Sequence, residues 1–206
     1  MTEPTGEPTS KRPLGVAVAV GAGVLVVVGA VVLPSVLGGD DESESQAPPA
    51  SPGATVDTSN LALVQEYDLP PWHHTSDDVD YPQSPPVGGD HFDPWLECGV
   101  YDVPVSDELA VHDLEHASVW ITYRPDQVDA EGVAELAGAL PQNGIMSPYP
   151  TQEAPVVITA WARQLALIGP DDPRIALFID KYGAGETAPE AFASCAGGTT
   201  EPTPGA

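Results

Sequence analysis

The sequence predicts a single small α+β domain with a mainly antiparallel sheet and two helices, preceded by one transmembrane helix. Three observations lead to this fold class. A long uncharged run lies near the N-terminus, strand-like and helix-like segments alternate in the order β-α-β-β-α after residue 117, and 24 prolines with 20 glycines in 206 residues leave room for only one core.

Residues 14–37 form the uncharged run, and they predict a membrane span. At 1.5 Å per residue the run is long enough to cross a hydrocarbon layer about 30 Å thick. It is also longer than the apolar part of a cleaved signal peptide, which has about 7 to 15 residues. Lys11 and Arg12 precede the run and acids follow it, so residues 1–13 are expected in the cytoplasm and the rest outside the cell membrane.

The net charge of −25 excludes nucleic acid as a partner, because phosphate binding needs clustered cations. Cations and acids balance in the first 38 residues, so the whole surplus of acid lies beyond the predicted span. Residues 38–59 are acidic and Pro-rich and predict a disordered stalk, and residues 196–206 predict a disordered tail. Residues 60–195 remain as the extracytoplasmic domain.

Within this domain the predicted elements follow from periodicity and from helix start and stop signals. Residues 61–67 predict an early strand, and the aromatic-rich stretch 68–95 predicts a long structured loop. The remaining predictions are strands at 118–123, 156–161 and 164–168 and helices at 129–140 and 172–182. The last two strands are expected to form a hairpin.

Cys98 and Cys195 are the only cysteines. Outside the membrane the default expectation for such a pair is a disulfide, and its spacing excludes a CxxC redox motif. Closing a loop of about 100 residues would stabilise the domain by roughly 4 to 5 kcal/mol.

All five histidines lie between residues 73 and 116, and they carry the candidate chemistry. His112 and His116 are four residues apart, so they share a face if their turn is helical. Two histidines in this arrangement can both bind one metal ion. His91 could add a third imidazole, and the thioether of Met146 a fourth ligand that would favour copper over zinc. Asp113 and Glu115 are the carboxylates expected to orient the ligands. Histidines near carboxylates and tryptophans are, however, often ordinary packing residues.

His112 to His116 also spell H-x-x-E-H, the motif of the inverted zinc peptidases, for which Glu190 would be a late third ligand. That motif belongs on a helix, whereas here it runs directly into a strand sequence, and the domain is much smaller than those peptidases. No serine elbow, phosphate loop or dinucleotide fingerprint occurs in the sequence, so no catalytic residue is predicted. An enzyme is the least supported of the function classes considered.

Several motifs occur in a fixed order: YPQSPPVGGDHF from residue 81, CGVYDVPV from 98, VHDLEHASVWITYRPD from 111, SPYP from 147 and VVITAWAR from 156. In this respect the chain resembles the bacterial family called domain of unknown function 3105 (DUF 3105) over about residues 60–195. The resemblance implies a membrane-anchored or exported protein, largely actinobacterial, without an established activity. The family usually has Gly where this chain has Ala117, and often has Pro-Pro-Thr-Ser-Gly-Pro-His where this chain has Pro-Pro-Val-Gly-Gly-Asp-His. If that Gly permits a close backbone approach or a positive φ, Ala117 would strain the turn.

Two function classes therefore stay open. The first is an extracytoplasmic metal-binding module for copper or zinc, with His91, His112, His116 and Met146 as ligands. The second is a non-catalytic cell-envelope module for a protein or glycan partner, in which the histidines only order the loop. Convergence of the imidazole nitrogens to within about 4 Å of one point would favour the metal, since metal bonds to nitrogen are about 2.0 to 2.1 Å long.

Overall fold

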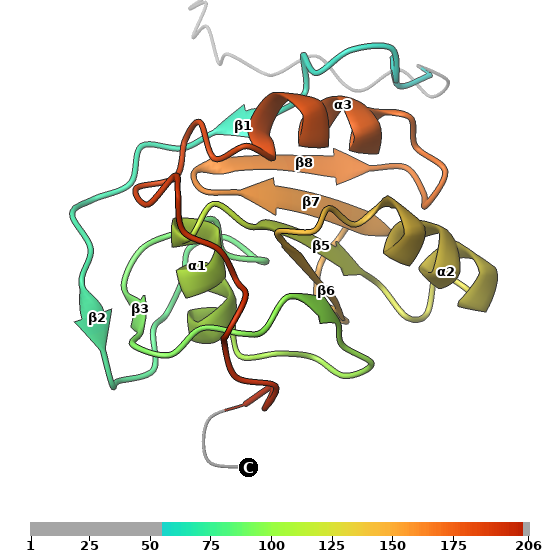
Figure 1. Ribbon diagram of the computed structural model, residues 1–206. Helices are drawn as coiled ribbons and strands as arrows, with labels where there is room; N and C mark the ends of the chain where they lie inside the picture. Colours follow the sequence, from blue (N-terminus) through green and yellow to red (C-terminus); the bar gives the residue numbers. More distant parts are fainter. Residues whose placement is uncertain (1–54, 204–206) are drawn as a thin grey trace, which may run out of the picture. The chain divides into compact units, whose positions relative to one another are not determined.

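The computed structural model describes residues 55–203 of the chain (Figure 1). The segments predicted as the cytoplasmic N-terminus and the transmembrane helix, and most of the predicted stalk, lie outside the described residues. Within 55–203, no helix combines the length and apolar character that a membrane crossing requires.

The described residues form three helices and eight strands. The strands are β1 (Gln65–Glu66), β2 (His74–Thr75), β3 (His91–Phe92), β4 (Gly99–Val100), β5 (Val119–Tyr123), β6 (Gly144–Pro148), β7 (Val156–Ala160) and β8 (Arg163–Leu167), and the helices are α1 (Asp107–Glu115), α2 (Ala130–Ala139) and α3 (Arg174–Tyr182). Six strands form one sheet in the order β1-β8-β7-β5-β6-β4, while β2 and β3 form a separate pair. The α+β prediction is confirmed.

The six-stranded sheet is antiparallel on one side and parallel on the other. β1, β8, β7 and β5 pair antiparallel, and β7 and β8 form the expected hairpin. β6 pairs parallel with both β5 and β4. Parallel neighbours need a crossover connection, and α2 supplies it between β5 and β6. The sequence did not predict β6, because the Gly at its start and the Pro at its end are residues typical of loops.

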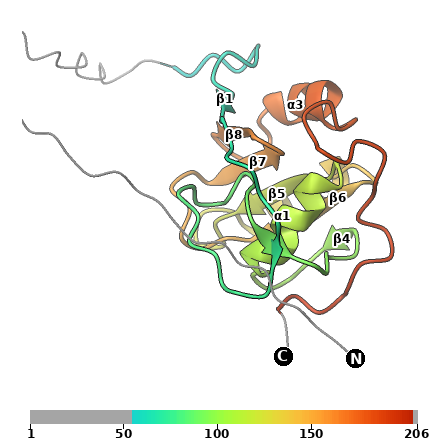
Figure 2. The same cartoon turned by 90° about the vertical axis from the view of Figure 1, so that its left-hand side faces the viewer.

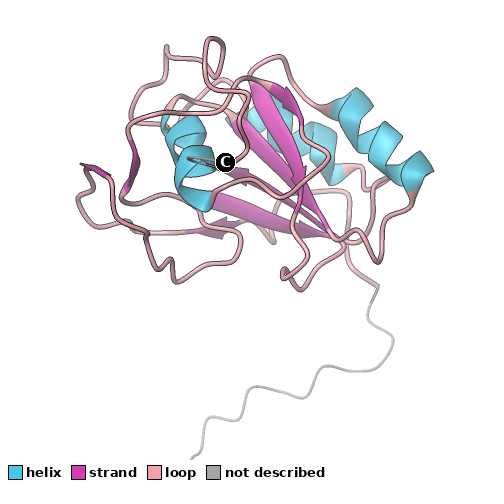
Figure 3. Cartoon of the chain, turned by 90° about the horizontal axis from the view of Figure 1, so that it is seen from below, coloured by secondary structure: helices cyan, strands magenta, loops and turns pink. Residues whose placement is uncertain are grey.

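The two faces of the sheet pack against different elements (Figures 1 and 3). Along β5, Val119, Ile121 and Tyr123 face a core shared with α2 and α3, whereas Trp120 faces a second core built with α1. This alternation is the period of two that a strand imposes on its side chains. Every residue of β5, β6 and β7 is buried, so the centre of the sheet is covered on both faces.

Helices α2 and α3 form where the sequence predicts them. Asp129 caps α2 by accepting a hydrogen bond from the amide of Gly132 at 2.9 Å, and Pro173 precedes the first residue of α3. Helix α1 was not predicted, so the expectation of two helices is wrong. Buried polar residues among its nine residues obscure the apolar period that normally identifies a helix.

The disulfide between Cys98 and Cys195 is present, and it ties the C-terminal segment to the α1 face of the domain. Beyond it, the segment predicted as a tail is ordered as far as the described residues reach. Thr199 exchanges backbone hydrogen bonds with Trp95 and Glu97, and Ser106 donates its amide to Pro202 at 2.7 Å. Figure 2 shows this segment passing beside β4. Composition alone could not reveal this order, because backbone groups make the contacts.

Candidate metal site

Helix α1 presents one face of functional side chains. Asp107 and Glu108 stand in its first turn, where negative charge complements the helix dipole. Buried Leu109 and Leu114 fix its orientation by packing in the same core as Trp120. Separations of three and four residues then bring His112, Glu115 and His116 together on the helix surface.

The turn after α1 has a positive φ at Ala117, the position where the family usually has Gly. Ala117 has a φ of 64°, in the left-handed region that favours glycine. Its amide bonds to the carbonyl of Leu114 at 3.2 Å, and the amide of Ser118 bonds to the carbonyl of Asp113 at 3.0 Å. The chain thus leaves the helix directly for β5, which is why the helical motif abuts a strand.

Strands β2 and β3 add two further imidazoles. They pair in parallel with His74 opposite His91, so both rings lie over α1. The ring centroids of His74, His91 and His112 are separated by 4.8 Å in each of the three pairs. Sequence reasoning missed His74. The only available signal was its place in the histidine cluster, since a two-residue strand inside a Pro-rich loop shows no period.

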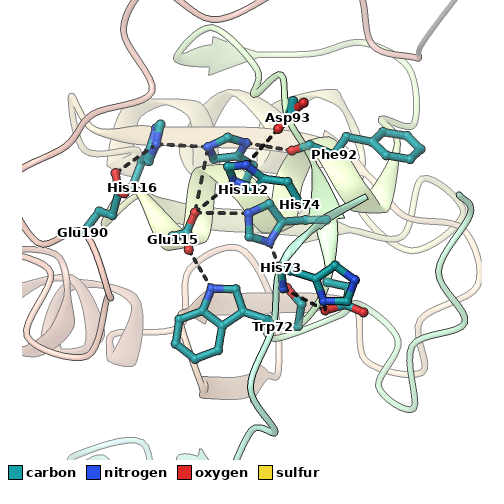
Figure 4. Close-up of polar contacts among 12 residues, drawn as sticks. Trp72, His73, His74, Phe92, Asp93, His112, Glu115, His116 and Glu190 are labelled. Carbon is teal, nitrogen blue, oxygen red and sulfur yellow. Dashed lines mark hydrogen bonds and ion pairs between the residues drawn. The ribbon is translucent and has the colours of Figure 1, made fainter. Parts of the chain in front are cut away.

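The three imidazoles converge on one carboxylate oxygen (Figure 4). The Nε2 atoms of His91, His74 and His112 lie 3.1, 3.7 and 3.9 Å from Oε2 of Glu115. The four candidate ligand atoms all lie within 4.8 Å of one another. Tetrahedral bonds of about 2.0 to 2.1 Å place ligand atoms about 3.3 Å apart, so little movement separates this cluster from a coordination shell.

The opposite ring nitrogens are held by oxygen atoms. The Nδ1 atoms of His91 and His112 lie 2.8 Å from the carbonyl oxygens of Gly89 and Phe92, and Nδ1 of His74 lies 2.8 Å from Oδ1 of Asp93. A carbonyl oxygen can only accept, so Nδ1 of His91 and His112 must carry the proton. In the neutral ring this leaves the Nε2 lone pair free to bind a metal, and it fixes the direction of the ring.

The protonation states suit a cation. Burial would by itself raise the pKa of Glu115, but the hydrogen bond that Trp72 Nε1 donates to Oε1 at 2.6 Å and the charges of neighbouring histidines outweigh it, so this pKa is lowered. Burial lowers the pKa of His112 to about 4. At neutral pH, His112 is therefore a neutral imidazole and Glu115 an ionised carboxylate, the forms that bind metals without first losing a proton.

His116 lies beside this cluster rather than inside it. Its Nε2 is 3.1 Å from Nε2 of His112 and 3.4 Å from Oε2 of Glu190. The ring of Trp95 contacts it at a centroid distance of 4.9 Å, and its buried Nδ1 makes no hydrogen bond of ordinary geometry with any residue among 55–203. His116 thus lacks the Nδ1 anchor of the other rings. Without a metal, His116 Nε2–H can donate to the lone pair of His112, and Glu190 offers an alternative acceptor.

Two of the residues singled out in the sequence lie apart from the histidines. Met146 is fully buried in the core with α2 and α3, on the other face of the sheet. Asp113 accepts a hydrogen bond from the amide of Leu96 at 3.1 Å, and burial raises its pKa well above the ordinary value. The structure therefore brings together His91, His112 and Glu115 with His74. Glu115 lies among the candidate ligand atoms of this cluster, and the thioether of Met146 lies outside it.

Residues 112–116 also match the H-x-x-E-H motif of the inverted zinc peptidases. His112 to Glu115 are helical, so the argument that this motif runs into a strand without forming a helix is wrong. Glu190 also approaches His116, as that motif would require of a third ligand. Glu115, however, would be the general base in such an enzyme, and here Trp72 occupies one of its oxygens while three imidazoles face the other.

The chain matches the family model described as "Protein of unknown function (DUF3105)" over residues 73–197. This match covers more than half of the chain and includes the histidine cluster, so the protein belongs to this family. No curated protein and no solved structure matches it.

Proposed function

We propose that this member of the DUF3105 family is a metal-binding protein that holds one divalent transition metal ion, zinc or copper(II). The ligands are Nε2 of His74, His91 and His112 and the carboxylate of Glu115. The observation that carries the proposal is the convergence of three Nε2 atoms on one carboxylate oxygen while each Nδ1 contacts an oxygen on the outside.

An ordinary packing role explains this arrangement poorly. Three Nε2 atoms that face one ionised carboxylate need protons or a metal ion between them. One proton could serve for His91 and Glu115, whose Nε2 and Oε2 are 3.1 Å apart. His74, which lies between the carboxylates of Asp93 and Glu115, would need a further proton on its Nε2 for the same purpose. A metal ion satisfies all four ligands at once.

The ligand set also narrows the metal. Three imidazoles and a carboxylate suit zinc and copper(II), whereas copper(I) prefers thiolates and thioethers. Met146 no longer favours copper over zinc, because its side chain lies on the other face of the sheet. Zinc commonly takes four ligands of these types, whereas the general affinity order of divalent metals favours copper(II).

The site is proposed to face the outside of the cell membrane, on a protein anchored by residues 14–37. The uncharged run and the basic residues before it support the anchor, and the Cys98–Cys195 disulfide supports an oxidising compartment. Protease added to intact spheroplasts should digest the domain while a cytoplasmic marker survives. Protection of the domain until lysis would contradict this location.

Metal analysis tests the metal proposal. Full-length protein is purified in detergent without chelator, and its metal content is measured by plasma mass spectrometry beside a His91→Ala, His112→Ala variant. His73→Ala is the matched control, because His73 is a neighbouring exposed histidine that pairs with Asp90 and lies outside the cluster.

Wild type and control are expected to carry about one equivalent of zinc or copper, and the double variant almost none. Equal metal content in all three proteins would overturn the proposal. The histidines would then be packing residues, and a protein or glycan partner would become the leading interpretation.

A further inference from the structure

The four proposed ligands differ sharply in their exposure to solvent. The side chains of His91, His112 and Glu115 are 0%, 4% and 9% exposed, whereas the side chain of His74 is 45% exposed. The site is therefore closed on three sides and bounded on the fourth by a single surface imidazole. Four protein ligands fill a coordination shell as in a structural zinc site, but here one of the four can be reached from solvent.

The segment that carries His74 is also the most weakly attached part of the site. Strand β2 has two residues, pairs only with β3 and takes no part in the six-stranded sheet. The backbone bond from the amide of His91 to the carbonyl of His73 is long, at 3.4 Å. Strand β3 is equally short, but it packs against α1 and its His91 is fully buried, while His112 and Glu115 sit on that buried helix. Displacing His74 thus breaks few contacts, whereas displacing any other ligand disturbs the core.

The contact that holds His74 from outside is itself exposed. Its Nδ1 lies 2.8 Å from Oδ1 of Asp93, whose side chain is 83% exposed. The Nδ1 atoms of the two buried rings are held by main-chain carbonyls instead. An incoming ligand can therefore reach His74 and its anchor without opening the domain.

We infer that the site exchanges its metal through His74, so that the ion is cargo rather than a permanent structural part. This inference rests on the proposed metal site. The bond from the metal to His74 Nε2 breaks as a bond forms to a nitrogen or sulfur donor of the incoming ligand. The metal keeps its charge, and His91, His112 and Glu115 hold it until further donors replace them. The partner is thus a metal carrier or acceptor that offers an accessible imidazole or thiolate.

Transfer kinetics test this inference. Full-length protein loaded with one equivalent of zinc is mixed with the chromogenic chelator 4-(2-pyridylazo)resorcinol, and zinc transfer is followed by absorbance. The rate is expected to rise with chelator concentration, because the chelator enters as His74 leaves. Asp93→Ala should speed transfer by about tenfold, since the loss of a residue that orients a ligand typically costs that much affinity. His74→Ala should be at least as fast, and His73→Ala should match wild type.

The outcomes are separable. A wild-type protein that takes up no zinc would refute the metal site itself. Zinc uptake with transfer that is independent of chelator concentration, and equal rates in wild type and Asp93→Ala, would refute exchange through His74 and leave the site standing. If His74→Ala retains no zinc, the transfer rate of Asp93→Ala relative to that of His73→Ala decides whether the metal leaves through His74.

Discussion

The two faces of the central sheet solve different problems. On one face, Ile158 of the sheet packs in an apolar core with Leu136 of α2 and Phe178 of α3. Against α1, the sheet faces a core that adjoins buried histidines, Asp113 and Glu115. The first face gains free energy from burial, whereas the second removes polar groups from water and needs partners for them.

This difference separates stability from function within one small domain. Each polar residue buried on the α1 face costs stability unless a hydrogen bond or a metal offsets it. A chain selected for stability alone would place apolar residues there. Changes on the α2 and α3 face should therefore alter unfolding but not metal binding, and changes around the histidines should mainly alter metal binding.

The disulfide should give the largest effect, because it supports the face that is poorer in apolar packing. Replacing Cys98 and Cys195 with Ser removes a link across 97 positions of the chain. The free energy of unfolding should fall by about 4 to 5 kcal/mol through the greater entropy of the unfolded chain. Chemical denaturation of wild type and the double variant measures this. A loss below about 1 kcal/mol would show that the α1 face is stable without the link.

A cavity in the apolar core tests the opposite face. Phe178 is fully buried on α3, and Phe178→Ala should cost about 3 to 5 kcal/mol of stability. Zinc affinity of the folded variant, measured by titration at low temperature, should match wild type. A large drop in affinity would show that the two faces are coupled and would break the proposed division.

Acid should destabilise the metal-free protein through the α1 face. The pKa of His112 is about 4 in the folded state against an ordinary 6.5, so below pH 6.5 the unfolded chain binds the extra proton. Its contribution to stability is complete above pH 6.5 and is lost as the pH falls to 4, by up to about 3 kcal/mol. Denaturation at pH 7, 5 and 4 measures the loss. His112→Leu should lose less over this range, and an equal pH dependence would contradict the assignment.

Trp72 should matter for metal binding more than for folding. Its indole N–H holds Oε1 of Glu115, and Trp72→Phe keeps an aromatic ring against Trp161 while removing that donor. Metal affinity is expected to fall about 10- to 100-fold, as is usual when a ligand loses the group that orients it. Competition with a chelating dye gives the affinity. If affinity is unchanged while stability falls, Trp72 is only a packing residue.

The smallest effect concerns the turn after α1. Ala117 has a positive φ, so Ala117→Gly relieves backbone strain, and the greater entropy of unfolded glycine offsets part of the gain. The stability change should lie within about 1 kcal/mol and be favourable. Thermal unfolding measures it, and a clear destabilisation would show that the Ala117 methyl group packs usefully.

The same division governs what the sequence could predict. The hairpin of β7 and β8 and the helices α2 and α3 follow apolar periods and capping residues such as Asp129, and the structure confirms them. On the α1 face, buried polar residues hide the helix, and β2 and β3 are too short to show a period. Residue type and spacing indicated His91 and His112 as candidate ligands and Glu115 as an orienting carboxylate. They did not indicate His74, because only the pairing of distant loop segments brings it to the site.

The central claim is that His74, His91, His112 and Glu115 bind one metal ion. X-ray absorption at the zinc edge, on full-length protein loaded with one equivalent of zinc, tests it most directly. Three imidazole nitrogens and one oxygen at about 2.0 to 2.1 Å are the predicted result. A spectrum of fully hydrated zinc, or one with a sulfur ligand, would contradict the claim.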